Sequence, residues 1–318
     1  MKRAIICGVS GQDGAYLAKL LLEQNYEVYG STRDLKSSSF DNLKLLGIFD
    51  SVKTVSMSLN DSQSVLNVLE KIVPDEIYNL TGPSSVSLSF EEPFETIKSI
   101  TQGTLNLLEA MRRISSQIRL YNASSSECFG NLGVVKASEK SAFNPRSPYA
   151  IAKSTAHWSV VNYREAYNLF ACNGILFNHE SCLRPERFVT QKIVQTAKKI
   201  ANGEKTKLIL GNTDIIRDWG WAPEYVEAMW LMLQCNKADD YIVATGKSVS
   251  LLYFVEVVFK YYDLDWRRYL KIDQDLFRLT DIKENYANPE KAKVNLGWQA
   301  KYDVNDVARF MCQGSQII

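Results

Sequence analysis

Short apolar runs alternate with amphipathic segments from about residue 3 to about residue 177. The apolar runs predict six strands, over residues 4–7, 27–29, 54–56, 76–79, 118–122 and 174–177. Between them, residues 15–23, 62–71 and 95–113 carry apolar side chains at helical spacing. This order of strand, helix and strand predicts an α/β fold, a Rossmann-like doubly wound parallel sheet with helices on both faces.

The pattern changes after residue 177. Residues 178–188 are polar and predict a loop, and a mixed segment with Trp219, Trp221 and Trp230 follows. We therefore expect a division into residues 1–177 and a smaller mixed α/β region over residues 178–318.

A glycine-rich turn follows the first predicted strand directly and precedes a predicted helix. Its sequence is Gly8-Val9-Ser10-Gly11-Gln12-Asp13-Gly14. In this position glycines let backbone N–H groups and a helix N-terminus approach a pyrophosphate. We expect residues 1–177 to form a dinucleotide-binding domain, with cofactor contacts from Gly8, Ser10, Gly11, Gln12, Asp13 and Gly14.

The end of the second strand bears on which dinucleotide is bound. Arg33 stands where such enzymes meet the adenosine ribose, and a cation there suits the 2′-phosphate of NADP. Asp34 follows at once and could instead accept the ribose hydroxyls of NAD. The sequence favours NADP and leaves NAD possible.

Tyr149 and Lys153 lie four residues apart at the start of a predicted helix, with Pro148 suited to its first turn. This spacing places both side chains on one helix face. A free phenol has a pKa of about 10, and a neighbouring ammonium together with a nicotinamide charge would stabilise the phenolate. Tyr149 is therefore a candidate base for a substrate hydroxyl.

Hydroxyls and one carboxylate follow the fifth predicted strand, in Ser124-Ser125-Ser126-Glu127-Cys128-Phe129-Gly130. The carboxyl edge of an open α/β sheet is where ligands bind. We expect Ser125 and Glu127 to face the nicotinamide.

The chain resembles the GDP-mannose 4,6-dehydratases, within the extended short-chain dehydrogenase/reductases. The resemblance extends over most of the length. It is carried by the glycine-rich turn, by Ser124 to Gly130, by the Tyr149/Lys153 pair, and by residues 178–181, 184, 188–190, 211–212, 217–220, 225–230, 277–281 and 288–298.

The resemblance implies a mechanism. Tyr149 takes the proton from O4 of the hexose while NADP accepts hydride from C4, and Glu127 then removes the C5 proton as water leaves C6. The hydride returns to C6. Ser125 would hydrogen-bond near O4, and Lys153 would orient the cofactor ribose and support Tyr149.

The resemblance also implies binding residues, and it makes residues 178–318 a nucleotide-sugar-binding region that interleaves with the first domain. Further cofactor contacts are implied for Leu80, Tyr149, Lys153, His179 and Arg184. Substrate contacts are implied for Ser84, Ser85, Asn178, Glu180, Val189, Lys192, Gly211, Arg217, Arg278 and Asp281. Arg217 and Arg278 offer fork-shaped donors for a diphosphate, or could be structural ion-pair arginines.

Four positions depart from the family pattern. Ser125 replaces a threonine, Pro83 replaces a glutamine, Lys247 replaces a glutamate, and Asp34 stands near where a second arginine is usual. These changes leave open a dehydratase, epimerase or reductase for another nucleotide sugar such as GDP-mannoheptose, and a non-catalytic homologue that binds a nucleotide sugar. Glu127 discriminates among the enzymes, because a 4-epimerase or reductase needs no base at C5.

Composition limits the partners. The chain has 37 Lys and Arg against 36 Asp and Glu, so no overall charge favours a nucleic acid or a membrane surface. The six cysteines and two histidines have no zinc-like spacing, which predicts no metal site and reduced thiols. No signal-like or membrane-spanning apolar run is present, which predicts a cytoplasmic protein. The resemblance adds an expected homodimer or homotetramer.

Overall fold

The computed structural model describes residues 1–314 and is built around a seven-stranded parallel sheet. The strand order is β10-β6-β5-β4-β1-β2-β3. The bounds are β1 Arg3–Cys7, β2 Glu27–Thr32, β3 Lys53–Ser56, β4 Glu76–Asn79, β5 Arg119–Ser125, β6 Phe170–Leu176 and β10 Asp240–Val243. From β3 to β6 this is the order of a doubly wound dinucleotide-binding sheet. The predicted fold class is confirmed.

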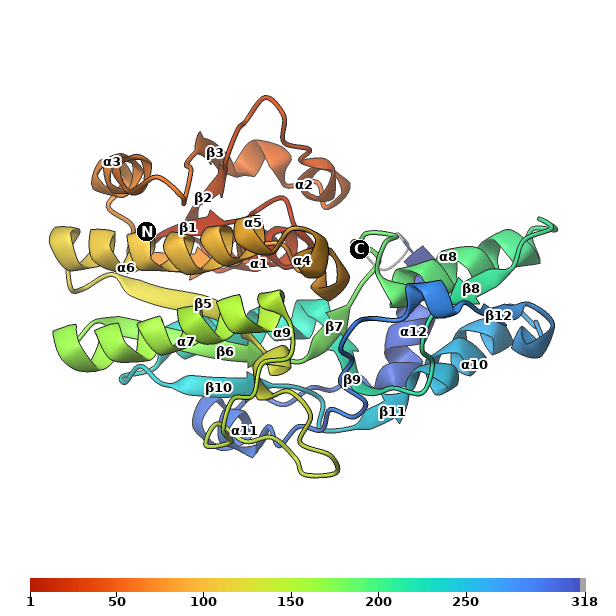
Figure 1. The fold of residues 1–318 in the computed structure, drawn as a ribbon. Helices are drawn as coiled ribbons and strands as arrows, with labels where there is room; N and C mark the ends of the chain where they lie inside the picture. The colour runs from red at the N-terminus through yellow and green to blue at the C-terminus, as the bar shows by residue number, and fades with distance from the viewer. Residues whose placement is uncertain (315–318) are drawn as a thin grey trace.

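Helices cover both faces of this sheet (Figure 1). On one face lie α3 Ser62–Ile72, α6 Gly103–Ile114 and α7 Pro148–Tyr167, and on the other α1 Gln12–Glu23, α9 Ala222–Gln234 and α11 Glu290–Leu296. Successive strand side chains point to opposite faces, so Ile5 packs in one core while Ala4 and Ile6 pack in the other. Both faces of the sheet are therefore apolar and buried.

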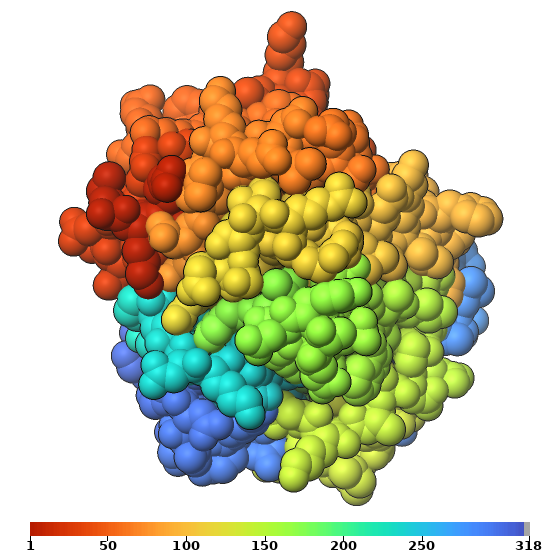
Figure 2. Space-filling view, turned by 90° about the vertical axis from the view of Figure 1, so that its left-hand side faces the viewer, coloured from red at the N-terminus to blue at the C-terminus, as the bar shows by residue number. Residues whose placement is uncertain are grey.

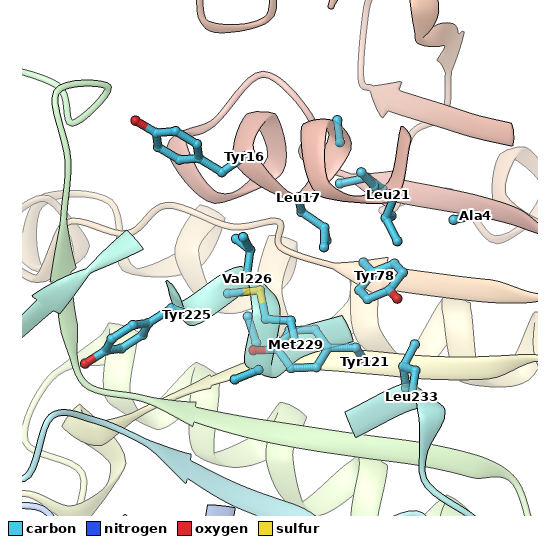
Figure 3. Close-up of a cluster of buried hydrophobic side chains, with 14 of the residues drawn as sticks. Ala4, Tyr16, Leu17, Leu21, Tyr78, Tyr121, Tyr225, Val226, Met229 and Leu233 are labelled. Carbon is cyan, nitrogen blue, oxygen red and sulfur yellow. The ribbon is translucent and has the colours of Figure 1, made fainter. Parts of the chain in front are cut away.

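Helix α9 comes from the second half of the sequence and packs against α1 of the first. Leu17 and Leu21 of α1 and Met229 of α9 meet in one core, together with Tyr78 and Tyr121 from the sheet (Figure 3). Strand β10 also follows residue 177 and pairs with β6. The assignment of separate binding roles to residues 1–177 and 178–318 stays a prediction.

A smaller α/β part lies at the other end of the molecule (Figure 1). Its strands form a three-stranded sheet, β11-β9-β7, and a two-stranded sheet, β12-β8. The bounds are β7 Asn178–Glu180, α8 Val189–Ala201, β8 Leu208–Leu210, β9 Ile216–Trp221, β11 Ser248–Ser250, α10 Leu251–Tyr261, β12 Leu270–Ile272 and α12 Val304–Gln313. Trp219, Phe254 and Val258 belong to its core.

The predicted loop over residues 178–188 was wrong at its start, where β7 pairs in parallel with Trp219–Trp221 of β9. Three polar residues carry no alternating pattern, so only this long-range pairing defines the strand. The fifth strand also runs beyond its predicted end, because Ala123, Ser124 and Ser125 pair with Gly174, Ile175 and Leu176.

The helix predicted over residues 95–113 is interrupted. It consists of α5 Pro93–Ile97, a π-helical turn over Lys98–Gln102, and α6. Within residues 1–177, two short α-helices were not predicted, α2 Asp41–Leu45 and α4 Val86–Glu91.

One view of the surface shows α6 bordering on α7, and a projecting loop that follows β2 (Figure 2). Residues 33–37 of this loop are exposed. Within residues 1–314, no helix has both the length and the apolar character that crossing a bilayer requires.

Candidate active site

The glycine-rich turn connects β1 to α1 and can be formed only with glycine at two places. Gly8 has a φ of +89°, which favours glycine. A Cβ on Gly14 would lie 2.3 Å from the carbonyl oxygen of Gly8 and 2.7 Å from Cα of Val9. The first turn of α1 therefore packs directly on the backbone of the turn.

The N-terminus of α1 offers free donors to an anion. Gly11 is its N-cap residue, and no side chain of the described residues caps the helix there. The first N–H groups of a helix have no partner within the helix, and they carry a partial positive charge. This arrangement fits the pyrophosphate of a dinucleotide.

A cavity of about 620 Å³ opens at this turn, and we call it the glycine-turn cavity. It lies at the carboxyl ends of β1 and β4, where the strand order reverses and where open α/β sheets bind ligands. The predicted cofactor residues that line it are Gly8, Ser10, Gly11, Gln12, Asp13, Gly14, Arg33, Leu80 and Arg184.

Only one of the two residues expected to choose between NADP and NAD lines this cavity. Arg33 does, and its Nη2 lies 3.4 Å from Oε1 of Glu95. The carboxylate of Asp34 instead accepts the N–H of Lys36 at 2.9 Å, within its own loop.

A second cavity, of about 340 Å³, is lined by all four predicted catalytic residues, Ser125, Glu127, Tyr149 and Lys153. We call it the tyrosine cavity. It shares Asp13, Leu80, Pro83, Ser84 and Arg184 with the glycine-turn cavity, so the two adjoin. Tyr149 and Glu127 therefore face one space beside the proposed dinucleotide groove.

Local structure explains how these side chains reach the cavity. Ser147 caps α7 by accepting the N–H of Ala150 at 3.1 Å, and Pro148 occupies the first turn. Ser125 ends β5, and its hydroxyl accepts the N–H of Glu127 at 3.2 Å. This bond begins a 3₁₀ turn over Ser126–Phe129, which places Glu127 on the cavity wall.

Burial shifts the pKa values of Tyr149 and Lys153 in opposite directions, each toward the neutral form. Burial raises the pKa of Tyr149, and a hydrogen bond from Ser125 opposes the rise. Burial lowers the pKa of Lys153 to about 8. Nζ of Lys153 donates to the carbonyl of Ala123 at 2.7 Å and lies 5.9 Å from the centre of the Tyr149 ring. The expected stabilisation of the phenolate by Lys153 is not seen in the chain alone, because burial disfavours both charged forms.

The ten predicted substrate residues all line the tyrosine cavity. They are Ser84, Ser85, Asn178, Glu180, Val189, Lys192, Gly211, Arg217, Arg278 and Asp281. The two arginines meet at one carboxylate: Asp281 lies 3.4 Å from Nη2 of Arg217 and 3.6 Å from Nη1 of Arg278. Both expected roles, in an ion pair and toward a diphosphate, are compatible with this position.

Other predicted residues hold each other in place along the cavity wall. Glu180 accepts the hydroxyl of Thr190 at 2.7 Å and lies 3.2 Å from Nε of Arg184. The guanidinium of Arg184 lies 3.8 Å from the centre of the Phe188 ring. His179 also lines the tyrosine cavity.

Several lining residues were not predicted. Ser58 and Asn60 line the glycine-turn cavity, and their place just after the third strand could have indicated them. Glu92 and Glu95 line it from α5 and the residue before it, where no sequence signal indicates them.

Of the departures from the family pattern, Pro83 lines both cavities, whereas Lys247 lies on an exposed turn outside them.

Comparison with known proteins supports the resemblance to the GDP-mannose 4,6-dehydratases. The sequence profile described as GDP-mannose 4,6 dehydratase matches residues 5–311. GDP-mannose 4,6 dehydratase 1 of Arabidopsis thaliana is 45% identical over 322 residues, which cover 98% of this chain and 88% of that protein.

Two solved structures share the fold at low identity. A dTDP-glucose 4,6-dehydratase from Bacillus anthracis in complex with NAD has a TM-score of 0.85 and 18% identity, over 99% of this chain and 96% of that one. RMD from Pseudomonas aeruginosa complexed with NADPH has a TM-score of 0.80 and 19% identity, over 100% and 99%. On the profile match and the identity to the plant enzyme, the chain belongs to the GDP-mannose 4,6-dehydratase family.

Proposed function

We propose that this protein is a lyase, a nucleotide-sugar 4,6-dehydratase that converts GDP-mannose to GDP-4-keto-6-deoxymannose. The observation that carries the proposal is that Tyr149 and Glu127 line the same cavity. One reaction at C4 and a second at C5 and C6 need a base for each, and both bases must reach a single hexose.

The cofactor proposed for this chemistry is a nicotinamide dinucleotide, with its pyrophosphate at the N-terminus of α1 and its ribose near Lys153 and Tyr149. When bound, the nicotinamide would bring positive charge beside Tyr149, accept hydride from C4 and return it at C6. The structures solved with NAD and NADPH support this class of cofactor. Arg33 favours NADP over NAD, because it is the cation at the end of β2 and it lines the cavity.

Tyr149 is proposed to take the proton from O4. In the chain alone burial raises the pKa of this phenol, and positive charge entering the cavity would favour the phenolate. The hydrogen bond from Ser125 acts in the same direction, because it favours the phenolate.

Glu127 is proposed to take the proton from C5. A carbonyl at C4 makes the hydrogen on C5 acidic, and its removal lets the hydroxyl on C6 leave as water. A 4-epimerase or a reductase would not need this carboxylate. The position of Glu127 on the wall of the tyrosine cavity therefore favours dehydration over these alternatives.

The substrate is proposed to be a GDP-sugar, with Arg217 and Arg278 near its diphosphate. GDP-mannoheptose is the nearest alternative substrate. Incubation with GDP-mannose, GDP-mannoheptose and other nucleotide sugars, followed by mass analysis, should give loss of one water from GDP-mannose first. No water loss from any of them would leave the non-catalytic binding role.

Replacement of the C5 base tests the mechanism. Glu127→Gln should lower the rate of water loss about 10²- to 10⁴-fold, the usual contribution of a general base. Reduced nicotinamide should accumulate in a single turnover, because the first step remains. Glu186→Gln, at an exposed position outside both cavities, is the control for loss of a carboxylate. Unchanged water loss in Glu127→Gln would contradict the assignment.

The assembly is proposed to be a homodimer or homotetramer. Phe94 of α5 is 89% exposed and Trp158 of α7 is 56% exposed, and Ile97 and Ile151 of the same two helices are exposed as well. Exposed apolar side chains of this kind are suited to association. The six cysteines are free thiols, which supports a cytoplasmic location.

A further inference from the structure

An ion pair lies at one end of the glycine-turn cavity. This is the end that is formed by β2. Nη2 of Arg33 and Oε1 of Glu95 lie 3.4 Å apart, and both residues line the cavity. The side chains are 73% and 45% exposed, so the contact is a single, solvated one. Such pairs are weak, typically below about 1 kcal/mol, and can exchange partners.

This place is where a dinucleotide presents its adenosine ribose. Arg33 is the first residue after β2, and its carbonyl accepts the hydroxyl of Ser56, the last residue of β3, at 2.9 Å. In doubly wound folds the residue at this position distinguishes a ribose hydroxyl from a 2′-phosphate. The backbone of Arg33 is thus fixed, while its guanidinium is shared with Glu95.

Carboxylates near this guanidinium would oppose the binding of a phosphate. Glu92 and Glu95 both line the cavity, and Glu95 is paired with Arg33. A 2′-phosphate that pairs with Arg33 competes with Glu95 for the guanidinium and lies near its carboxylate. Like charges at a few ångströms repel, with an energy of about 1 kcal/mol per pair of unit charges even in water.

Building on the nicotinamide cofactor of the proposed function, we propose that Glu95 sets the cofactor preference through its pairing with Arg33. Glu95 pairs with the cation that would hold the 2′-phosphate. It thereby lowers the affinity for NADP and leaves the affinity for NAD unchanged. The chain therefore binds both dinucleotides, and its affinities for NADP and NAD differ less than they would with Arg33 alone. Glu95 is a specificity-determining residue, not a catalytic one.

Binding of the reduced cofactors tests this without turnover. Dissociation constants for NADPH and NADH are measured by fluorescence titration of the full chain, for the wild type, Glu95→Gln, Arg33→Gln and the double variant. Glu95→Gln should tighten NADPH about three- to tenfold and change NADH less than about twofold. Arg33→Gln should weaken NADPH, and in that background Glu95→Gln should lose most of its effect.

The control is Glu91→Gln, which removes a carboxylate from the exposed end of α4, outside the cavity. It should leave the ratio of the two dissociation constants unchanged. High salt should shrink the effect of Glu95→Gln, because both charges are exposed. Thermal unfolding confirms that each variant is folded.

The outcomes separate the two proposals. An unchanged ratio in Glu95→Gln, or the same shift in Glu91→Gln, would overturn the role of Glu95 while the cofactor assignment stands. Binding of neither NADPH nor NADH to the folded wild type would overturn the nicotinamide cofactor, and the role of Glu95 with it.

Discussion

Asp13 and His179 form a hydrogen-bonded ion pair, with Nε2 of His179 2.8 Å from Oδ2 of Asp13. The other ring nitrogen faces the carbonyl of Phe177 at 2.7 Å. Both ring nitrogens thus meet acceptors, which suits an imidazolium that donates twice. The pair joins the start of α1 to β7, and so connects the glycine-rich turn to the strand that borders the tyrosine cavity.

The pKa values of Asp13 and His179 shift in opposite directions. Burial would raise the pKa of Asp13, but His179 outweighs it and the pKa falls to about 2. Burial would lower the pKa of His179, but Asp13 outweighs it and the pKa rises above its usual value. The charged pair is therefore the stable state near neutral pH.

We predict that the pair makes stability depend on pH in two windows. The contribution of His179 is complete below its unfolded pKa of about 6.5 and is lost as the pH rises through the raised folded value. The contribution of Asp13 is complete above its unfolded pKa of about 3.9 and is lost as the pH falls toward 2. Urea unfolding of the cofactor-free chain at a series of pH values measures both.

His179→Gln supplies the comparison. The free energy of unfolding of the wild type should exceed that of the variant most between these windows, and the difference should shrink as the pH rises above 6.5. Parallel curves for the two proteins across that range would show that the imidazole is not charged in the folded state.

The hydroxyl of Ser125 should influence the pH dependence of the reaction. Its hydrogen bond lowers the pKa of Tyr149, so Ser125→Ala should move the limb of the pH–rate profile that belongs to the base to higher pH. The rate at neutral pH should fall about ten- to a hundredfold. Ser125→Thr keeps the hydroxyl and should retain the wild-type profile. A slower Ser125→Ala enzyme with an unshifted profile would assign the residue to positioning of the substrate instead.

Two of the three glycines of the turn, Gly11 and Gly14, should differ in how much stability their replacement by alanine costs. Gly14→Ala places a Cβ 2.3 Å from a backbone oxygen, so it should destabilise the fold by about 1–3 kcal/mol or more. At Gly11, where φ is −73° and the nearest atom to a Cβ would be 3.4 Å away, alanine should cost little stability. Thermal unfolding of the two variants gives the comparison. Equal loss of stability would mean that the turn shifts to make room at Gly14.

The sequence predicted those features that depend on short periodic patterns and on turn residues. The strand and helix order up to β6, the glycine-rich turn, and the Tyr149/Lys153 pair after Pro148 all depend on residues close together in the chain. Burial was harder to foresee: the spacing of Tyr149 and Lys153 suggested a stabilised phenolate, yet both side chains are enclosed, and enclosure disfavours charge.

What the sequence did not predict depends on long-range contacts. Strand β10 is four residues long and joins the sheet only by pairing with β6. Glu95 follows Arg33 by 62 residues, and no local pattern indicates that the two meet. The pairing of Asp13 with His179 spans 166 residues and depends on the packing of the two halves.

The most direct test of the central claim follows a deuterium atom through the reaction. GDP-mannose labelled with deuterium at C4 is incubated with the protein and a catalytic amount of nicotinamide dinucleotide, and the product is examined by mass spectrometry and NMR. The account predicts a product that has lost one water and carries the deuterium at C6. Unchanged GDP-mannose, or a dehydrated product in which C6 carries no deuterium, would contradict it.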